Sequence, residues 1–395
     1  MLAGCSTTLT LAPEAPHAPG PALAALPRFA EERDERLAAR GAARPDRVVD
    51  ATAPGAPASS PGLAAPVRLR SSERRIGLPA GRSVVEVEVA AGRLVSIAVF
   101  GPSDALLAFD VANAPFAGAV RAHGALDEDG VLPRVASFRT PLGADRISVI
   151  VDATQPVELA RIEADPTAVA PPPPKALKLG QAEPRPLIGF PAPVSREDGY
   201  LLQSPGRYQF LRVDVAAALL AALRQTRVRF RRDPIAIADI TQWDGVRPAT
   251  DLGRPRHISH EGGRDVDIAL PANDDSPSTV RVHCAGVLVE SDVHGCAPGT
   301  ARGVDALRLA YLLGLLVDGE PAEPGATPRD HVEKIFTDDV YVREIRKAAE
   351  VLRERRWIKD AGYAALSEDG LLRPSPWHTD HVHVRFVGEP GRPLW

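Results

Sequence analysis

The sequence predicts a multidomain protein in which an N-terminal tether precedes a β-sandwich-like domain and a C-terminal α+β domain with a small antiparallel sheet. Residues from about 7 to 65 are rich in Ala, Pro and Gly, which is typical of a mostly disordered tether. Residues from about 67 to 165 alternate short apolar stretches with turn signals, as β-sandwiches do. The remaining residues mix helical and strand periods. A chain of 395 residues is long enough for two or three such domains.

The domain boundaries are predicted from changes in composition. The tether is assigned to residues 1–65, and the β-sandwich-like domain to residues 66–166. A Pro-rich segment over residues 167–186 predicts a stiff linker, which leaves residues 187–395 for the C-terminal domain. The sandwich region is poor in the aromatic side chains on which sugars stack. We therefore favour a spacer or a module that docks a protein over a module that binds glycan.

Local patterns predict the main elements. Strands of the sandwich are expected at four places: Val85–Val89, Leu94–Phe100, Arg146–Val151 and Val157–Ile162. In the C-terminal domain we expect one strand at Ile235–Thr241. We also expect three helices, at Val213–Gln225, Leu307–Leu316 and Val340–Arg356. One further helix is expected in the tether, at Arg28 to Arg40.

Composition and the first residues bear on location and partners. The formal net charge of −4 gives no support to nucleic-acid binding or to a polybasic membrane anchor. Leu307 to Val317, the longest apolar run, is too short to span a membrane. Residues 2–5 read Leu-Ala-Gly-Cys, a pattern similar to a bacterial lipobox, although no charged segment and apolar core precede it. This pattern predicts lipidation of Cys5 and a periplasmic location, with the outer membrane as the site of anchoring; a chance match is the alternative.

Two cysteines lie twelve residues apart in a loop-rich segment. In an exported protein, Cys284 and Cys296 are expected to form a disulfide. The neighbouring His283 and His294 suggest a metal site as the alternative. The segment lacks the close Cys-x-x-Cys pairs of structural zinc sites, so the disulfide is favoured.

The stretch from His257 to Leu270 contains several candidate functional residues close together. His257 and His260 lie on a predicted loop, and two glycines then allow a tight turn into an alternating strand. In that strand Asp265 and Asp267 point to one face, while the intervening apolar residues point to the core. Imidazoles and carboxylates are thereby brought together, and zinc is bound by such nitrogen and oxygen ligands.

A second stretch near the C-terminus adds three more histidines. His378 is followed by an alternating run that predicts a strand, with His381, His383 and Arg385 on one face. Five of the ten histidines in the chain therefore fall in two short stretches. An ordinary buried histidine explains any one of them, but not all five beside acids on strands.

The pattern His-x-x-His-x-x-Gly-x-Asp-x-Asp, followed much later by His-x-x-His-x-His, resembles the penicillin-insensitive murein endopeptidases. These belong to the zinc peptidase group that also includes lysostaphin-type enzymes, D-alanyl-D-alanine peptidases and the hedgehog domain. The resemblance covers about the last half of the chain. It implies an α+β zinc peptidase domain acting on peptidoglycan stem peptides.

The resemblance also implies roles for individual residues. The zinc ligands would be His260, Asp267 and His383, and His381 would be the general base that takes a proton from the attacking water. His257 and His378 would stabilise the oxyanion or orient the substrate. Asp265 is expected to hydrogen-bond to a ligand histidine and fix the tautomer of its imidazole. Glu261 is expected to lie beside the ligands.

The chain departs from the resemblance at two positions, and three functions compete. Thr379-Asp380 stands where an acid and an aromatic residue are usual, and Glu261 stands where an amide is common. The first function is an endopeptidase that opens D-alanyl–diaminopimelate crosslinks. The second is a D-alanyl-D-alanine carboxypeptidase, for which Arg264 and Arg385 would cap the substrate carboxylate. The third is a non-catalytic wall-binding or scaffold lipoprotein with a vestigial site.

Overall fold

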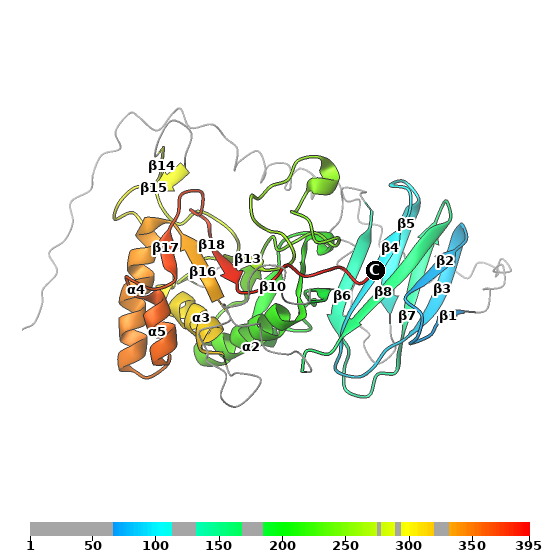
Figure 1. The fold of residues 1–395 in the computed structure, drawn as a ribbon, viewed down its shortest axis with the longest axis horizontal. Helices are drawn as coiled ribbons and strands as arrows, with labels where there is room; N and C mark the ends of the chain where they lie inside the picture. Colours follow the sequence, from blue (N-terminus) through cyan, green and yellow to red (C-terminus); the bar gives the residue numbers. More distant parts are fainter. Residues whose placement is uncertain (1–65, 113–131, 168–184, 275–277, 289–293, 320–331) are drawn as a thin grey trace, which may run out of the picture. The chain divides into compact units, whose positions relative to one another are not determined.

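The computed structural model describes residues 66–112, 132–167, 185–274, 278–288, 294–319 and 332–395 (Figure 1). The predicted tether, its helix at Arg28 to Arg40, the lipobox-like Cys5 and most of the predicted linker lie outside these residues. Residues Leu63–Trp395 form one compact unit of mixed α+β structure. No helix among the described residues is both long and apolar enough to cross a membrane.

The N-terminal part of this unit consists of two four-stranded sheets packed face to face. One sheet has the order β1-β3-β7-β5: β1 (Val67–Leu69), β3 (Gly81–Glu88), β7 (Arg146–Ala153) and β5 (Leu106–Ala112). The other has the order β2-β8-β4-β6: β2 (Arg75–Leu78), β8 (Val157–Ala164), β4 (Leu94–Phe100) and β6 (Arg134–Arg139). Alternate side chains from both sheets, such as Val85 and Ile97, share one hydrophobic cluster. The four strands expected from the sequence are present.

A six-stranded sheet, ordered β10-β12-β13-β18-β16-β17, organises the C-terminal part. Its strands are β10 (Tyr200–Leu202), β12 (Ile235–Ile237), β13 (Asp265–Ala269), β18 (His381–Phe386), β16 (Val332–Thr337) and β17 (Leu372–Pro374). The prediction of an antiparallel sheet was wrong at both edges, because β10 pairs with β12, and β16 with β17, in parallel. Each of these pairs is joined through helices, and a crossover of that kind returns the chain in the same direction. The central pairs are antiparallel.

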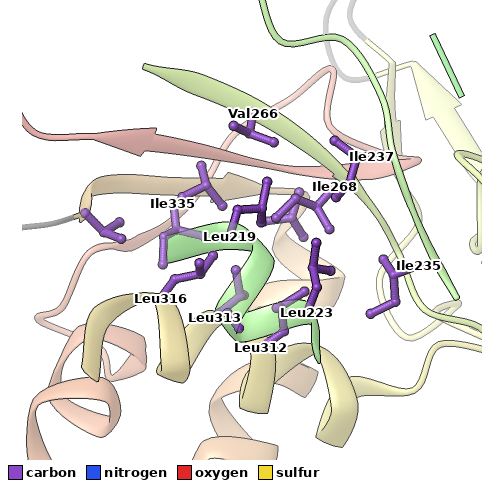
Figure 2. Packing of buried hydrophobic residues seen from close by; sticks show 14 of the residues in the cluster. Leu219, Leu223, Ile235, Ile237, Val266, Ile268, Leu312, Leu313, Leu316 and Ile335 are labelled. Carbon is purple, nitrogen blue, oxygen red and sulfur yellow. The ribbon is translucent and has the colours of Figure 1, made fainter. Parts of the chain in front are cut away.

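Helices cover one face of this sheet (Figure 1): α2 (Val213–Phe230), α3 (Ala306–Asp318), α4 (Asp339–Glu354) and α5 (Asp360–Leu366). Figure 2 shows Leu223 of α2 and Leu312 of α3 directed toward Ile237 and Ile268 of the strands. These side chains are fully or almost fully buried, and removing such apolar surface from water is the main stabilising term. The three predicted helices are therefore present, each extending slightly beyond or ending slightly short of its predicted bounds.

Shorter elements complete the fold. Two further antiparallel pairs are formed by β9 (Leu187–Gly189) with β11 (Phe210–Arg212), and by β14 (Gly286–Leu288) with β15 (His294–Cys296). The three described 3₁₀ turns are η3 (Arg196–Asp198), η4 (Gly206–Tyr208) and η5 (Thr250–Leu252). Cys284 and Cys296 form the predicted disulfide, with their Cα atoms 5.6 Å apart, so that the β14–β15 pair is closed at its base.

The β-sandwich contacts the C-terminal part through the outer face of the β2-β8-β4-β6 sheet. Leu94 and Val135 belong to the same hydrophobic cluster as Phe210 of β11. Gly189 N–H donates to Ser96 Oγ at 2.9 Å, and a Cβ on Gly189 would lie only 1.8 Å from Ser137 Oγ. This close approach explains a glycine there. The two parts therefore share a hydrophobic core. The domain boundaries expected at residues 166 and 187 stay a prediction.

Candidate metal centre

The register of β13 and β18 brings the two histidine stretches together. Asp267 stands directly opposite His383, and Asp265 opposite Arg385, in an antiparallel pair. Because side chains alternate along strands, these four residues share one face, while Val266 lies on the other face with the helices (Figure 2). The alternation predicted for both strands is confirmed.

The turn before β13 brings the histidine loop close to this face. Gly262 and Gly263 adopt φ values of 63° and 65°, the left-handed region that favours glycine. A Cβ on Gly262 would lie 2.3 Å from Pro390, and one on Gly263 would lie 2.5 Å from the Cα of Leu211. Both positions are therefore restricted to glycine by conformation and by space.

Three ligand atoms converge at the centre of the face. His383 Nδ1 lies 3.1 Å from His260 Nε2 and 3.1 Å from Asp267 Oδ1, and His260 Nε2 lies 3.2 Å from the same oxygen. Ligands around a tetrahedral zinc ion with bonds of about 2.1 Å are about 3.4 Å apart. The ligand atoms of His257, His260 and Asp267 also lie within 4.8 Å of one another, so these three residues could hold a metal ion. His383 stands beside them through its contacts with His260 and Asp267.

The outer nitrogens of the two imidazoles are hydrogen-bonded to acceptors of the protein. His260 Nδ1 lies 2.7 Å from the Ile240 carbonyl, which can only accept, so the proton of the neutral ring is on Nδ1. His383 Nε2 lies 2.8 Å from Asp265 Oδ1 and donates to it. The two inner nitrogens and Asp267 Oδ1 face one another in a buried space. Such a group could hold a cation, and a carboxylate behind a histidine, as Asp265 is behind His383, is the arrangement that orients metal-binding histidines.

The same contacts favour ionised groups. Burial opposes the charge on Asp265, but the hydrogen bonds from His383 and Arg385 and the charges of His383 and His260 together outweigh burial, and the pKa of the carboxyl is lowered. Burial also opposes protonation of His383, yet the hydrogen bonds to Asp265 and Asp267 raise the pKa of the imidazole above its usual range. The two neighbouring carboxylates thus favour a proton on His383.

Asp239, a carboxylate that the sequence analysis did not select, fixes His257. Asp239 is 5 % exposed, and its Oδ2 accepts from His257 Nε2 at 2.9 Å while its Oδ1 accepts from Ser204 Oγ at 2.5 Å. The other ring nitrogen of His257 lies 3.7 Å from Asp267 Oδ2. The only sequence signal was an acid at the end of the apolar run 235–240.

His381 lies at the edge of the cluster with one nitrogen directed into it. Its Nδ1 donates to Asp380 Oδ1 at 2.6 Å, and its Nε2 lies 3.5 Å from Asp267 Oδ1. Burial lowers the pKa of the imidazole, but Asp267 and Asp380 together outweigh burial and raise it. Asp380, noted in the sequence only as a departure from the family pattern, therefore orients this ring.

His378 is less suited to stabilising an anion than the sequence analysis expected. Its Nδ1–H donates to the Pro376 carbonyl at 2.8 Å, so a neutral ring has only a lone pair on Nε2. Burial and the nearby His381 lower the pKa of His378 to about 4, which keeps the ring neutral near pH 7. A neutral His378 can accept a hydrogen bond from a substrate, but it cannot donate one from Nε2.

The remaining predicted residues lie away from the three converging atoms. The Glu261 side chain is 58 % exposed and pairs with Arg247 at 3.4 Å. Arg264 donates to the Gly388 carbonyl at 3.0 Å, and Arg385 Nε donates to Asp265 Oδ1 at 2.7 Å. Both arginines expected as caps for a substrate carboxylate thus have partners within the protein.

Comparisons with known proteins add little to this geometry. No family model and no curated protein matches the chain. Among solved structures, part of the chain is similar to Aeromonas hydrophila PliG, a periplasmic lysozyme inhibitor of g-type lysozyme. The similarity has 17 % sequence identity and a TM-score of 0.17, and it covers 25 % of this chain and 96 % of that one. A similarity this limited supports no statement about fold or function.

Proposed function

We propose that this protein is a zinc-dependent peptidoglycan endopeptidase that hydrolyses D-alanyl–diaminopimelate crosslinks between stem peptides. The observation that carries the proposal is the convergence of His260 Nε2, His383 Nδ1 and Asp267 Oδ1 within 3.1–3.2 Å of one another. The residues match the ligand positions implied by the family resemblance. Two imidazoles and one carboxylate also form a ligand set typical of catalytic zinc, which keeps a fourth position open.

A bound zinc ion and the general base His381 have separate roles in the proposed hydrolysis. When bound, zinc supplies a water of lowered pKa and polarises the scissile carbonyl. His381 accepts the proton of the attacking water at Nε2, because its Nδ1–H is held by Asp380. The same nitrogen then returns the proton to the leaving amine. The 3.5 Å distance from His381 Nε2 to Asp267 Oδ1 supports this role.

Two further histidines have roles in positioning the substrate. His378 accepts a hydrogen bond from a substrate N–H through Nε2, consistent with its lowered pKa. His257 lies against His260 with ring centroids 4.0 Å apart and is held by Asp239. It forms the wall of the site on the side of Asp267 Oδ2.

The contacts of Arg264 and Arg385 favour an endopeptidase over a carboxypeptidase. A carboxypeptidase needs a cation for the free carboxylate of its substrate, and both expected arginines are held by protein acceptors. The non-catalytic alternative is less favoured because the full ligand set, His381 and the orienting Asp380 are all present. The substrate lies in the cell wall, so the proposal includes export to the periplasm, and the Cys284–Cys296 disulfide is consistent with export.

Digestion of purified muropeptides tests the proposal. The protein should include the β-sandwich, because the two parts share a core. Crosslinked dimers should be converted to monomers, read by mass spectrometry, and a chelator should stop the reaction until zinc is restored. Asp267→Asn serves as the matched inactive control. Release of terminal D-alanine from pentapeptide monomers would instead indicate a carboxypeptidase, and zinc-loaded protein that does neither would contradict both hydrolase functions.

A further inference from the structure

A buried tyrosine hydroxyl connects the disulfide-closed segment to the second histidine stretch. Tyr341 lies on α4 and is 1 % exposed. Its hydroxyl accepts the N–H of His283 at 3.0 Å and donates to the carbonyl of Thr379 at 3.0 Å. The same oxygen lies 3.7 Å from Cys296 Sγ. One phenol therefore contacts both the segment closed by the disulfide and the loop that leads to His381.

Asp338 makes a second connection between the same two segments. Its Oδ2 accepts the N–H of Cys296 at 3.0 Å, while its Oδ1 accepts the N–H of Val340 and caps α4. Its own N–H donates to the carbonyl of His378 at 3.2 Å. The start of α4 is thus fixed simultaneously to the disulfide and to a histidine of the cluster.

Trp377 makes a third connection from the loop itself. Its N–H donates to the carbonyl of His294 at 3.2 Å, and the two rings meet edge to face with centroids 5.5 Å apart. Trp377 has a φ of 69°, which is uncommon and unfavourable for a residue other than glycine. Such a conformation persists only where surrounding contacts hold it, and those contacts come from the disulfide-closed segment.

We propose that Tyr341 is a positioning residue that makes the proposed hydrolysis depend on the oxidised Cys284–Cys296 bridge. The bridge holds His283, His294 and Cys296 in place, Tyr341 and Asp338 transmit that placement to the loop 377–380, and the loop places His378 and His381. The rings of His378 and His381 are 5.0 Å apart, so a shift of the loop moves the proposed proton acceptor. His381 is the first residue of β18 and pairs with Ala269, while His383 lies two residues further along the strand opposite Asp267, so we expect a shift of the loop to affect His381 more than His383. This inference rests on the proposed function.

The bridge gives the connection a redox dependence. A dithiol reductant attacks the Cys284–Cys296 bond by exchange, which leaves two cysteine thiols and the reductant as its disulfide. The covalent link between Cys284 and Cys296 is then lost, while the hydrogen bonds of Tyr341 and Asp338 remain as weaker links. We expect the reduced protein to keep its metal and to turn over more slowly.

Tyr341→Phe in the oxidised protein is the sharpest test, because it removes a single oxygen atom. We expect kcat to fall about tenfold to a hundredfold with KM and zinc content unchanged, since small displacements of catalytic groups have effects of this size. Tyr311→Phe is the matched control: Tyr311 is also buried, but it lies on α3 against Phe230 and Trp357. Equal kcat values for the two variants, or loss of zinc from Tyr341→Phe, would overturn the proposal.

Hydrogen exchange separates this inference from the proposed function. In Tyr341→Phe, and in wild-type protein treated with dithiothreitol, exchange should rise in peptides covering residues 375–381 and stay unchanged in β4 and β8. If the oxidised wild type hydrolyses no crosslink, the proposed function fails while this coupling can still be measured. Unchanged exchange in residues 375–381 on reduction would overturn the coupling whatever the activity. The Cys284→Ser/Cys296→Ser double variant should match the reduced protein in both measurements.

Discussion

The two faces of the β13–β18 pair share one backbone but carry side chains of opposite character. One face carries Val266, Ile268 and their partners, which are fully buried against helices. The other carries Asp265, Asp267 and His383, which are equally buried but charged or polar. The apolar face is stable by removal of surface from water, whereas the polar face needs partners for every lone pair.

This difference between the two faces shows where a metal ion could bind. The apolar face is complete without any added group. On the polar face, Ile240 and Asp265 accept from the outer nitrogens of the imidazoles, and the inner atoms of His260, His383 and Asp267 contact one another and could hold a metal ion. A metal ion should therefore stabilise one face and leave the other unaffected, and substitutions on the two faces should separate stability from metal binding.

The largest effect should come from the ligands. Asp267→Ala and His383→Ala should each abolish zinc retention and crosslink hydrolysis, since each removes one of three ligands. The wild type should gain about 4 kcal/mol of unfolding free energy when zinc is present at roughly 1,000 times its Kd, and the variants should gain almost none. Metal content after dialysis and denaturant unfolding with and without zinc measure both. Full zinc content in either variant would remove that residue from the ligand set.

His381→Ala should produce the next largest effect, confined to turnover. Its Nε2 is directed at the cluster, but the three converging atoms are complete without it. Loss of a general base lowers rates about 10²–10⁴-fold, so hydrolysis should fall by that factor with zinc and thermal stability retained. Zinc content and dimer cleavage should be measured on one preparation. A variant that loses its zinc would make His381 a ligand, and one that keeps full activity would remove it from the mechanism.

Ile268→Ala tests the apolar face. Truncating a fully buried isoleucine lowers the unfolding free energy by about 2–5 kcal/mol, because contacts are lost and a cavity remains. The zinc stoichiometry of the folded protein should stay unchanged, since Ile268 points away from the ligands. Val228→Ala on α2, where the residue is 69 % exposed, is the control and should change stability by less than about 0.5 kcal/mol. Loss of zinc from folded Ile268→Ala would show that the faces are not independent.

Local patterns allowed the centre of the site to be predicted. Strict alternation in two short runs gave β13 and β18 and the face on which their histidines and acids lie, because side-chain direction in a strand is set by its period. The disulfide followed from spacing and expected export. The continuous apolar run Leu94–Phe100 also contained information that was not used. Six of its seven residues are buried, as expected for a strand covered on both faces, and one of those faces contacts the C-terminal part.

Contacts between distant segments could not be read from the sequence. Asp239 reaches His257 across 18 residues and belongs to no motif, so only the fold shows that they meet. The parallel edges of the sheet depend on β10 and β17, each three residues long, which is too short for a periodic signal. Arg385 was expected to face the substrate. Its strand position was predicted correctly, but its guanidinium is held by Asp265 on the neighbouring strand.

Asp265→Asn should give the smallest effect, which is a change in metal affinity and not in the ligand set. Asp265 is 0 % exposed, and its Oδ1 accepts from His383 Nε2 and from Arg385 Nε. An amide keeps an acceptor there but removes the negative charge that makes the imidazole more basic. Zinc affinity should fall about 10–100-fold, as is usual when such an outer partner is changed. Titration of the metal-free protein against a zinc-buffered indicator measures this.

The number of protons released on zinc binding and a matched control variant make this last prediction specific. In the metal-free wild type the pKa of His383 is raised, so near neutral pH the ring carries a proton that zinc must displace. Asp265→Asn lowers that pKa toward its ordinary value of about 6.5, so fewer protons should be released per zinc bound. Calorimetry in two buffers of different ionisation enthalpy counts them. Asp318→Asn, at a buried carboxylate that accepts from the N–H groups of Lys359 and Gly362, should lower stability without changing zinc affinity or proton release. Equal affinities for the two variants would show that Asp265 has no influence on the metal.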